Sequence, residues 1–382
     1  MKRRLSLSRH SRSLITLAIT LAIAIALPLT ASADSLGYSA HDQDEGSVFV
    51  MTNAAAGNSV LAFEREADGA LMPERAFSTG GRGTGANLGT EGALALSDSG
   101  HWLLAVNAGS NSVSVFLVLG NYLVRTDAAP SGGASPISVA VAHDVVYVLN
   151  GDTGNVQGFR IDLDGRLKAI ANSSRSVGGS GTGSAEVSFN RAGDLLAVTQ
   201  KATGKVLTWA VDGNGRLGSV TSTNSPTPTP YGFAFGRADQ MLVSEANGGA
   251  PNGSSLSSYQ LYGNGGASLI SKSVPDHQTA ACWVVVTRQG GYAYTSNTAS
   301  DTLSTYTVSP VGELSLSQSV AAGTGHTPLD LGLDRTDQHL YVLNGGDSSI
   351  SAYTIGAKGS LHLLENHHAS QITPAATGLV AR

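Results

Sequence analysis

Residues 80–92 combine six glycines with one basic and one acidic side chain. Glycines let the backbone approach a ligand closely. Arg82 could pair with a carboxylate or polarise a carbonyl group, and Glu91 could accept a proton from water. No helix is expected after this segment, so it does not match a phosphate-binding loop. The alternative interpretation is a flexible surface loop with Arg82 in solvent.

Seven apolar runs along the chain each end in a polar side chain, six times an amide and once a carboxylate. If these ends share one face, they could hydrogen-bond a polar ligand, and Glu245 could also direct a proton. Asparagine before Gly or Ser also builds turns, so a structural role is the alternative, and the two roles are compatible. The residues are Asn53, Asn107, Asn150, Gln200, Glu245, Asn297 and Asn344.

Two histidines and the single cysteine are further candidates. His326 precedes Thr-Pro and could act as a base, or it is an ordinary loop histidine. His277, a candidate ligand-binding residue, lies five positions before Cys282, and a thiolate with a histidine base could open an ester. Cys282 adjoins an apolar run, so the alternative is a small buried side chain. The other histidines show no metal-ligand spacing, and we expect neither metal nor cofactor.

A repeat of about 50 residues must position these side chains. A strand with a central aromatic residue, then a glycine turn and a leucine, recurs seven times. Two further apolar runs precede each copy, and the residues in them alternate as in strands. The aromatic residues, spaced by 53, 43, 50, 50, 47 and 47 positions, are Phe63, Phe116, Phe159, Trp209, Tyr259, Tyr306 and Tyr353. Each interval holds four strands but is too short for a strand–helix–strand unit.

The first repeat lacks its innermost strand, and the end of the chain can supply it. Thr373-Pro374 followed by residues 378–380 echoes Thr327-Pro328 followed by Gly332-Leu333. The sequence therefore predicts an all-β fold, a seven-bladed β-propeller of four-stranded blades closed by the C-terminal strand in the first blade. An open solenoid is the alternative, but neither end shows the polar cap that it needs.

The N-terminus predicts export. Five basic residues lie within positions 2–12, and an apolar run over 14–29 is followed by Ala31 and Ala33. We expect a signal peptide over 1–33 with cleavage near Asp34, a polar segment over 34–46 and one propeller over 47–382. The route, general secretory or twin-arginine, and the destination, periplasmic or extracellular, stay open. An uncleaved anchor is the alternative, although the run is short for a membrane span.

Composition narrows the possible partners. The chain of 382 residues is 41% hydrophobic and 13% charged, which argues against disorder. Loss of the five basic residues changes the net charge from −5 to −10, so we expect no nucleic-acid partner. A single cysteine cannot form an internal disulfide. We expect a monomer without membrane contact after cleavage, with a lactone or another polar small molecule as ligand.

The chain resembles the seven-bladed lactonase family, which includes a bacterial 6-phosphogluconolactonase type and the fungal 3-carboxymuconate lactonizing enzyme. The resemblance rests on residues 97–107 (SDSGHWLLAVN), 340–344 (LYVLN) and the Gly-x-Leu turn at 165–167. It implies the propeller fold and action on a lactone. One family type carries Gly-Pro-Arg-His where this chain has Gly-Ser-Ala-Glu at 183–186, and another histidine of relatives is missing at Pro136-Ile137-Ser138.

Two functions remain open. The first is an exported enzyme that hydrolyses or forms an unphosphorylated lactone, with Glu91, Glu245 or His326 moving a proton and Arg82 stabilising negative charge. We do not expect 6-phosphogluconolactone as substrate, because an exported protein would not meet that cytoplasmic metabolite. The second is a non-catalytic propeller that binds a ligand, a polysaccharide or a partner protein.

Overall fold

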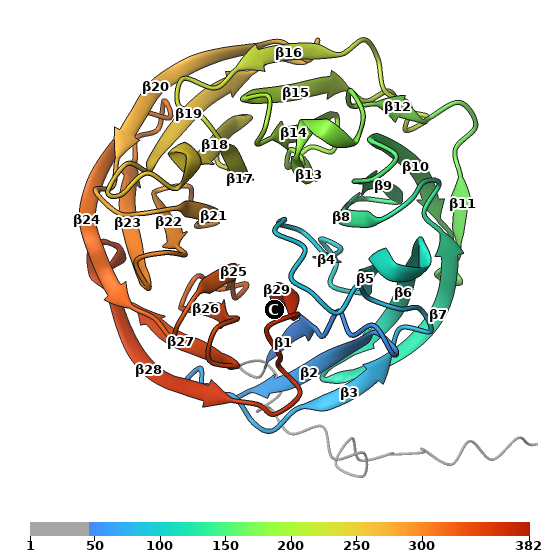
Figure 1. The fold of residues 1–382 in the computed structure, drawn as a ribbon, viewed down its shortest axis with the longest axis horizontal. Coiled ribbons are helices and arrows are strands. Elements are labelled where there is room, and N and C mark those ends of the chain that lie inside the picture. The colour runs from blue at the N-terminus through green and yellow to red at the C-terminus, as the bar shows by residue number, and fades with distance from the viewer. Residues whose placement is uncertain (1–45) are drawn as a thin grey trace, which may run out of the picture. The chain divides into compact units, whose positions relative to one another are not determined.

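The computed structural model describes residues 46–382, which form seven antiparallel sheets around a central channel (Figure 1). Each sheet is a blade, and we name its strands A to D from the channel outward. The predicted seven-bladed propeller with four-stranded blades is therefore confirmed. The predicted signal peptide and its cleavage point near Asp34 lie outside the described residues. Within residues 46–382, no helix has the length and apolar character needed to span a membrane.

Blades one to three have these strands in A to D order: β29 (Thr377–Ala381), β1 (Gly46–Met51), β2 (Ser59–Arg65), β3 (Arg75–Ser78); β4 (Leu94–Leu96), β5 (Trp102–Asn107), β6 (Ser112–Leu119), β7 (Tyr122–Pro130); β8 (Pro136–Ala142), β9 (Val145–Asn150), β10 (Asn155–Ile161), and then β11 (Leu167–Ala169) and β12 (Arg175–Ser176), which both pair with β10. Short 3-10 turns are η3 (Ala108–Ser110), η4 (Ser180–Thr182), η5 (Asn247–Gly249) and η6 (Ala357–Gly359).

Blades four to seven follow the same order: β13 (Ser184–Phe189), β14 (Leu195–Gln200), β15 (Lys205–Ala210), β16 (Thr221–Asn224); β17 (Pro230–Phe235), β18 (Gln240–Glu245), β19 (Ser255–Leu261), β20 (Ala267–Pro275); β21 (Ala281–Val286), β22 (Tyr292–Asn297), β23 (Thr302–Val308), β24 (Leu314–Gly323); β25 (Pro328–Leu333), β26 (His339–Asn344), β27 (Ser349–Ile355), β28 (Leu361–His368). We call the face with the D-to-A and B-to-C loops the upper face.

The C-terminal strand closes the ring as predicted. β29 pairs antiparallel with β1, with Val48 opposite Ala381 and Phe49 opposite Val380. Ser47 and Arg382 exchange two backbone hydrogen bonds just beyond this ladder. The first blade thus holds both ends of the described chain, and β29 covers the inner edge of β1.

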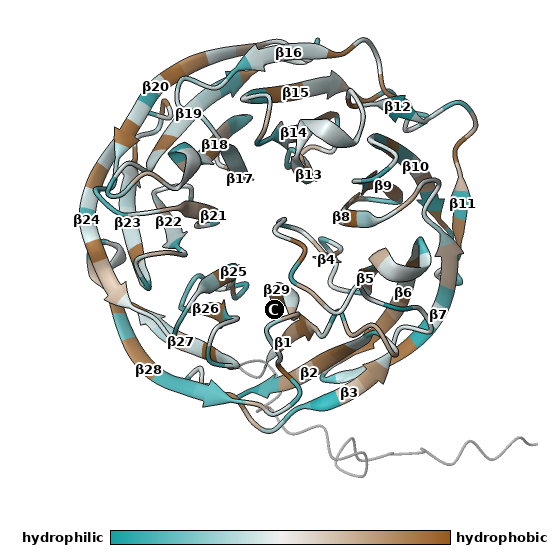
Figure 2. Cartoon of the chain, viewed as in Figure 1, coloured by the Kyte–Doolittle hydropathy of each residue, from teal (hydrophilic) through white to brown (hydrophobic). Residues whose placement is uncertain are grey.

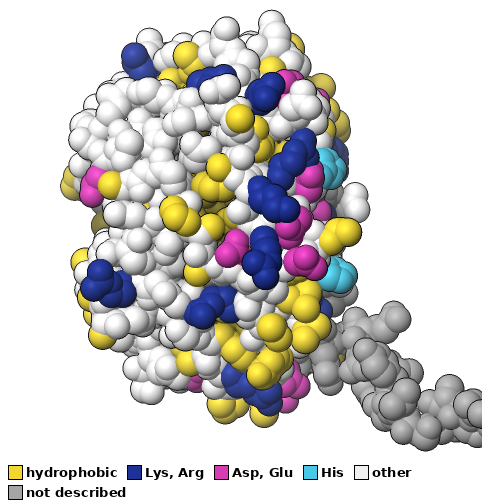
Figure 3. Space-filling view, turned by 90° about the vertical axis from the view of Figure 1, so that its right-hand side faces the viewer, with side chains coloured by type: hydrophobic (Ala, Val, Ile, Leu, Met, Phe, Trp, Pro, Cys, Tyr) yellow, Lys and Arg dark blue, Asp and Glu magenta, His cyan; other side chains and the backbone are white. Residues whose placement is uncertain are grey.

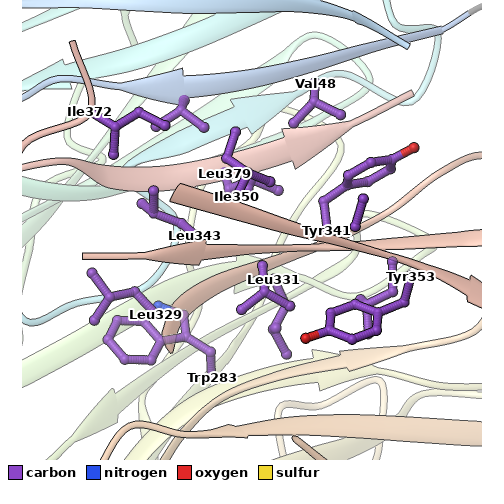
Figure 4. Close-up of a cluster of buried hydrophobic side chains, with 14 of the residues drawn as sticks. Val48, Trp283, Leu329, Leu331, Tyr341, Leu343, Ile350, Tyr353, Ile372 and Leu379 are labelled. Carbon is purple, nitrogen blue, oxygen red and sulfur yellow. The ribbon is translucent and has the colours of Figure 1, made fainter. Parts of the chain in front are cut away.

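Side chains of neighbouring blades fill the spaces between the sheets. The seven C-strand aromatic residues are at most 4% exposed, and hydrophobic and hydrophilic positions alternate along the strands (Figure 2). Figure 4 shows one of these layers, in which Leu331 and Leu379 of two inner strands meet Tyr341 and Tyr353. Truncation of such an aromatic residue to alanine costs about 3–5 kcal/mol. These layers make the blades a rigid frame for the channel.

Candidate functional site

Asparagines at the ends of three B strands hold their own blades together. Asn344 Nδ2 donates to the hydroxyl oxygens of Ser349 (3.0 Å) and Ser351 (2.8 Å), which ties β26 to β27. Asn107 and Asn297 make the same two contacts to C-strand hydroxyls in blades two and six. All three amides are fully buried. They therefore lie inside the blades, as in the structural alternative considered from sequence.

Glu245 takes the place of this asparagine in blade five. Its carboxylate accepts hydrogen bonds from the hydroxyls of Ser225 (2.7 Å), Ser255 (2.6 Å) and Ser257 (2.9 Å), and the residue has no exposed surface. An acceptor has replaced a donor, and the serine hydroxyls supply the protons instead. Because its oxygens are engaged in this way, Glu245 has the contacts of a structural residue.

The other three predicted ligand amides are also engaged. Asn53 Nδ2 donates to the Ala86 carbonyl oxygen (2.6 Å), and Asn150 Nδ2 donates to the Ser131 carbonyl oxygen (3.3 Å). Gln200 donates to a backbone carbonyl of the loop before its blade. The B-strand ends therefore do not converge as free amides on the channel.

The remaining predicted residues lie apart from one another. Arg82 is exposed, and no hydrogen bond or ion pair joins it to Glu91. His326 is exposed on the upper face, where the hydrogen bond that its Nδ1–H donates to Asp301 Oδ2 (2.9 Å) raises the histidine pKa. His277 is exposed, whereas Cys282 is buried in β21 and burial raises the pKa of its thiol to about 11. No contact joins these last two side chains.

The loop from blade one to blade two enters the channel (Figure 1). This channel loop, residues 79–93, is fixed to blades three and four. The Thr90 hydroxyl donates to a carbonyl of blade three (3.0 Å), and the Glu91 N–H donates to a carbonyl of blade four (3.1 Å). Lys201 Nζ of blade four donates to the Gly89 carbonyl oxygen (2.5 Å). These contacts hold Glu91 at the centre of the ring.

One repeat position lies beside a break in the pairing of the A and B strands in six blades, and just before β4 in blade two, so seven residues form a layer around the channel. At blade five this residue is Gly232, and a Cβ there would lie 1.7 Å from Glu91 Oε2. The Glu91 carboxyl group therefore fills the space that blade five leaves open. The seven residues are Ala93, Ser138, Glu186, Gly232, Trp283, Asp330 and Thr377. Glu91, Glu186 and Asp330 together are the carboxyl cluster.

The carboxyl cluster has no cationic partner among residues 46–382. Glu91 Oε2 and Asp330 Oδ2 are shielded and make no hydrogen bond, and Glu186 Oε2 accepts the Phe233 N–H (2.6 Å). Burial raises the pKa of Glu186 to about 8 and that of Asp330 to about 7. Burial, reinforced by Glu186 and Asp330, raises the pKa of Glu91 well above its usual range. Protonated and ionised carboxyl groups therefore coexist near neutral pH.

The carboxyl cluster lines a cavity of about 320 Å³ in the channel. Leu94, Val139 and Leu331 are among its apolar walls, and Asp98 and Arg191 lie among its charged lining residues. A neighbouring cavity of about 270 Å³, which shares Asp98 and Leu331, extends to the turns between the A and B strands. Water or a small molecule can therefore lie against the carboxyl groups within the channel.

A separate pocket of about 340 Å³, here called the upper pocket, lies among the upper-face loops. The rings of Tyr231 and Trp283 form its aromatic wall, with centroids 5.2 Å apart, and Leu329 and Pro374 also line it. Lys201 Nζ lies 4.5 Å from the centroid of the Tyr231 ring. Burial lowers the pKa of this lysine.

Sequence reasoning named Glu91 but missed Glu186 and Asp330 as site residues. Both occupy the same repeat position within A strands that are otherwise mainly apolar, β13 and β25. The sequence did contain a signal for these two residues, because an ionisable side chain occupies the same buried position in two of the repeats.

The fold is a closed seven-bladed propeller with three carboxyl groups beside a cavity in its channel. The chain belongs to the seven-bladed β-propeller lactonase family, because the family model described as Lactonase, 7-bladed beta-propeller matches residues 40–180 and 258–374. The resemblance drawn from the motifs is thereby confirmed. No curated protein sequence matches the chain.

Solved structures share the fold at low sequence identity. A protein from Lactobacillus plantarum is 20% identical with a TM-score of 0.69, over 88% of this chain and 99% of that one. A candidate 6-phosphogluconolactonase from Bacteroides fragilis is 16% identical (TM-score 0.68; 89% and 98%). The periplasmic gluconolactonase of Pseudomonas aeruginosa is 14% identical (TM-score 0.67; 88% and 99%). At these identities the similarity concerns the fold.

Proposed function

We propose that this protein hydrolyses a small uncharged lactone at the carboxyl cluster in its channel. Membership of the lactonase family supports a lactonase-type hydrolase at a coarse level. The observation that carries the proposal is the cluster itself. Three carboxyl groups that form no ion pair with another described residue line one cavity, and their raised pKa values supply both an acid and a base near pH 7.

Lactone opening needs a base for the attacking water and an acid for the leaving oxygen. Asp330, with a pKa of about 7, is the base, and Glu91, held protonated by burial and by Glu186, is the acid. The water oxygen bonds to the carbonyl carbon while its proton passes to Asp330. The ring C–O bond breaks, and the freed oxygen takes the proton of Glu91. A hydroxy acid forms, and the carboxyl groups then exchange protons with water in the cavity.

The charge and walls of the cavity select the substrate class. A phosphorylated or carboxylated lactone would place negative charge against the carboxyl cluster, which costs free energy in a low-dielectric site. Hydroxyl groups of a substrate could hydrogen-bond Ser188 and Asn190, which line the same cavity as Leu94 and Leu331. The charge argument favours an uncharged lactone. The product carboxylate is repelled by the same cluster, which favours its release.

The decisive experiment measures acid release from δ-valerolactone and glucono-δ-lactone by residues 34–382 between pH 5 and pH 9. We expect a bell-shaped pH profile of kcat/KM, because an ionised base and a protonated acid are both needed. Glu91→Gln and Asp330→Asn should each lower kcat by about 100-fold or more, and Asp330→Asn should also remove the acidic limb. Arg82→Ala, at an exposed site, is the matched control.

Folded wild-type protein that opens neither lactone would contradict the proposal. The alternative, a non-catalytic propeller that uses its channel to hold a ligand, would then be supported. Activity that survives Glu91→Gln with an unchanged pH profile would place the chemistry elsewhere.

Export is also a proposal. The basic residues at 2–12 and the apolar run at 14–29 support it, and one protein of similar fold is a periplasmic gluconolactonase. Cell fractionation, with mass spectrometry of the mature N-terminus, tests it. We expect a chain that starts near Asp34, and a full-length chain in the cytoplasmic fraction would overturn the idea. Gel filtration with light scattering tests the expected monomer.

A further inference from the structure

The upper pocket is not part of the proposed hydrolytic site. It shares no lining residue with the cavity that holds the carboxyl cluster. Its wall lies one residue from the seven-residue layer in the chain, because Leu329 precedes Asp330 and Tyr231 precedes Gly232. The two cavities are therefore neighbours on opposite sides of the inner layer of the ring.

Two polar side chains that line the upper pocket already have partners. Thr298 Oγ1 donates to the Pro328 carbonyl oxygen (2.9 Å). Asn87 Nδ2 donates to the Ala376 carbonyl oxygen (3.3 Å), and Asn87 Oδ1 accepts the N–H of Gly89 (2.7 Å). A ligand in this pocket would therefore contact mainly carbon atoms. A ligand rich in hydroxyl groups would lose its hydrogen bonds to water and gain few from the protein.

The aromatic wall is held in place from behind. Lys201 lies against the ring of Tyr231 and donates to the Gly89 carbonyl, so Tyr231 packs between the lysine and Trp283. Trp283 is 2% exposed and belongs to the core layer drawn in Figure 4 together with Leu329. A wall that is ordered before binding loses little entropy when a flat ligand packs on it.

Two consecutive glycines in blade seven leave room for the upper pocket. The B-to-C loop of this blade begins with Gly345 and Gly346, which both line the upper pocket. A Cβ on Gly345 would lie 2.9 Å from Leu329 Cδ1. At the matching position of blade three, a Cβ on Gly151 would lie 3.2 Å from Ile137 Cδ1, in a blade that contributes nothing to this pocket.

We propose that the upper pocket binds an uncharged aromatic molecule the size of two fused rings. A dry cavity of about 150 Å³ holds benzene, and the upper pocket, at about 340 Å³, has room for roughly twice that. Stacking and edge contacts with Tyr231 and Trp283 suit a flat ring. On the side of the molecule drawn in Figure 3, charged side chains gather toward the edge away from the upper face.

Fluorescence titration with prodan, an uncharged naphthalene dye, tests the proposal. We expect one site per chain, a blue shift of the dye emission and quenching of tryptophan emission that Trp283→Phe reduces. Gly345→Leu should weaken binding at least tenfold, because its side chain would occupy the pocket. Gly151→Leu is the matched control and should bind like the wild type.

Absence of saturable binding to folded wild-type protein would overturn the proposal. Equal affinity of folded Gly345→Leu and wild type would do the same. If Gly345→Leu does not fold, Pro374→Asp replaces it, because this exposed residue lines the same pocket. An ionised carboxylate beside the dye should weaken binding at least threefold, and unchanged affinity would again contradict the inference.

Discussion

Replacing Glu186 by glutamine should make the protein more stable at alkaline pH. The carboxyl group of Glu186 is buried in the channel, and its pKa lies at about 8 against an ordinary value of 4.5. Glutamine keeps an oxygen that can accept the Phe233 N–H, so this backbone hydrogen bond is retained. What the substitution removes is the cost of ionising an acid at this buried position.

The sign follows from proton binding. Between pH 4.5 and about 8 the folded protein keeps a proton on Glu186 that the unfolded chain has released, so the free energy of unfolding falls as pH rises. The difference between the two pKa values corresponds to on the order of 5 kcal/mol, part of which belongs to the coupling with Glu91 and Asp330. A buried amide with an incomplete set of partners would cost about 1–3 kcal/mol in return. We therefore expect Glu186→Gln to be at most equal in stability near pH 5 and more stable by a few kcal/mol at pH 8.5.

Urea denaturation between pH 5 and pH 9 measures this effect. Glu245→Gln is the matched control, because it neutralises another fully buried acid whose carboxylate accepts several hydroxyl protons. That variant should lose stability throughout the range. Parallel stability curves for wild type and Glu186→Gln, or a variant that is weaker at pH 8.5, would refute the view of the carboxyl cluster as unpaired buried acids.

Three other changes test the remaining structural arguments. Gly232→Ala would put a methyl group onto Glu91 Oε2, so we expect a loss of about 1–3 kcal/mol in urea denaturation and a tenfold or greater loss of lactone hydrolysis. Asn344→Ala removes two buried hydrogen bonds and should cost about 1–3 kcal/mol, measured against Arg82→Ala, which should stay within about 0.5 kcal/mol of wild type. Lys201→Met should speed amide hydrogen exchange in the channel loop while exchange in β14 and β15 is unchanged, and equal exchange in the loop would show that the lysine does not anchor it.

The fold was predictable because the blades follow local rules. Alternating strands, glycine turns and one aromatic residue per C strand recur in every repeat, and each of the seven aromatic residues lies in the C strand of its blade. The interruption of the A–B pairing in β13 and β21 by a bulge near the upper end has no such signal in the sequence pattern.

The site was less predictable because tertiary contacts create it. Glu91 attracted attention through its unusual loop, but nothing local shows that the loop turns into the channel. Glu186 and Asp330 could be compared once the repeats were aligned, yet their proximity to Glu91 depends on the gap at Gly232. The expected partnership of Arg82 with Glu91 assumed that neighbours in sequence are neighbours in space, and the exposed arginine shows that the loop separates them.

The three carboxyl groups are held by two different parts of the protein. Glu186 and Asp330 are on strands of the frame, whereas Glu91 is on a loop that reaches its place through a few hydrogen bonds and the gap at Gly232. A change that displaces the loop should therefore alter the Glu91 carboxyl and leave the blades intact, since their stability lies in the layers between sheets. A change inside a blade, such as Asn344→Ala, should lower the free energy of unfolding and leave the hydrolytic activity of the folded protein largely unchanged. We therefore expect that substitutions in the channel loop can lower activity while the free energy of unfolding stays close to that of the wild type.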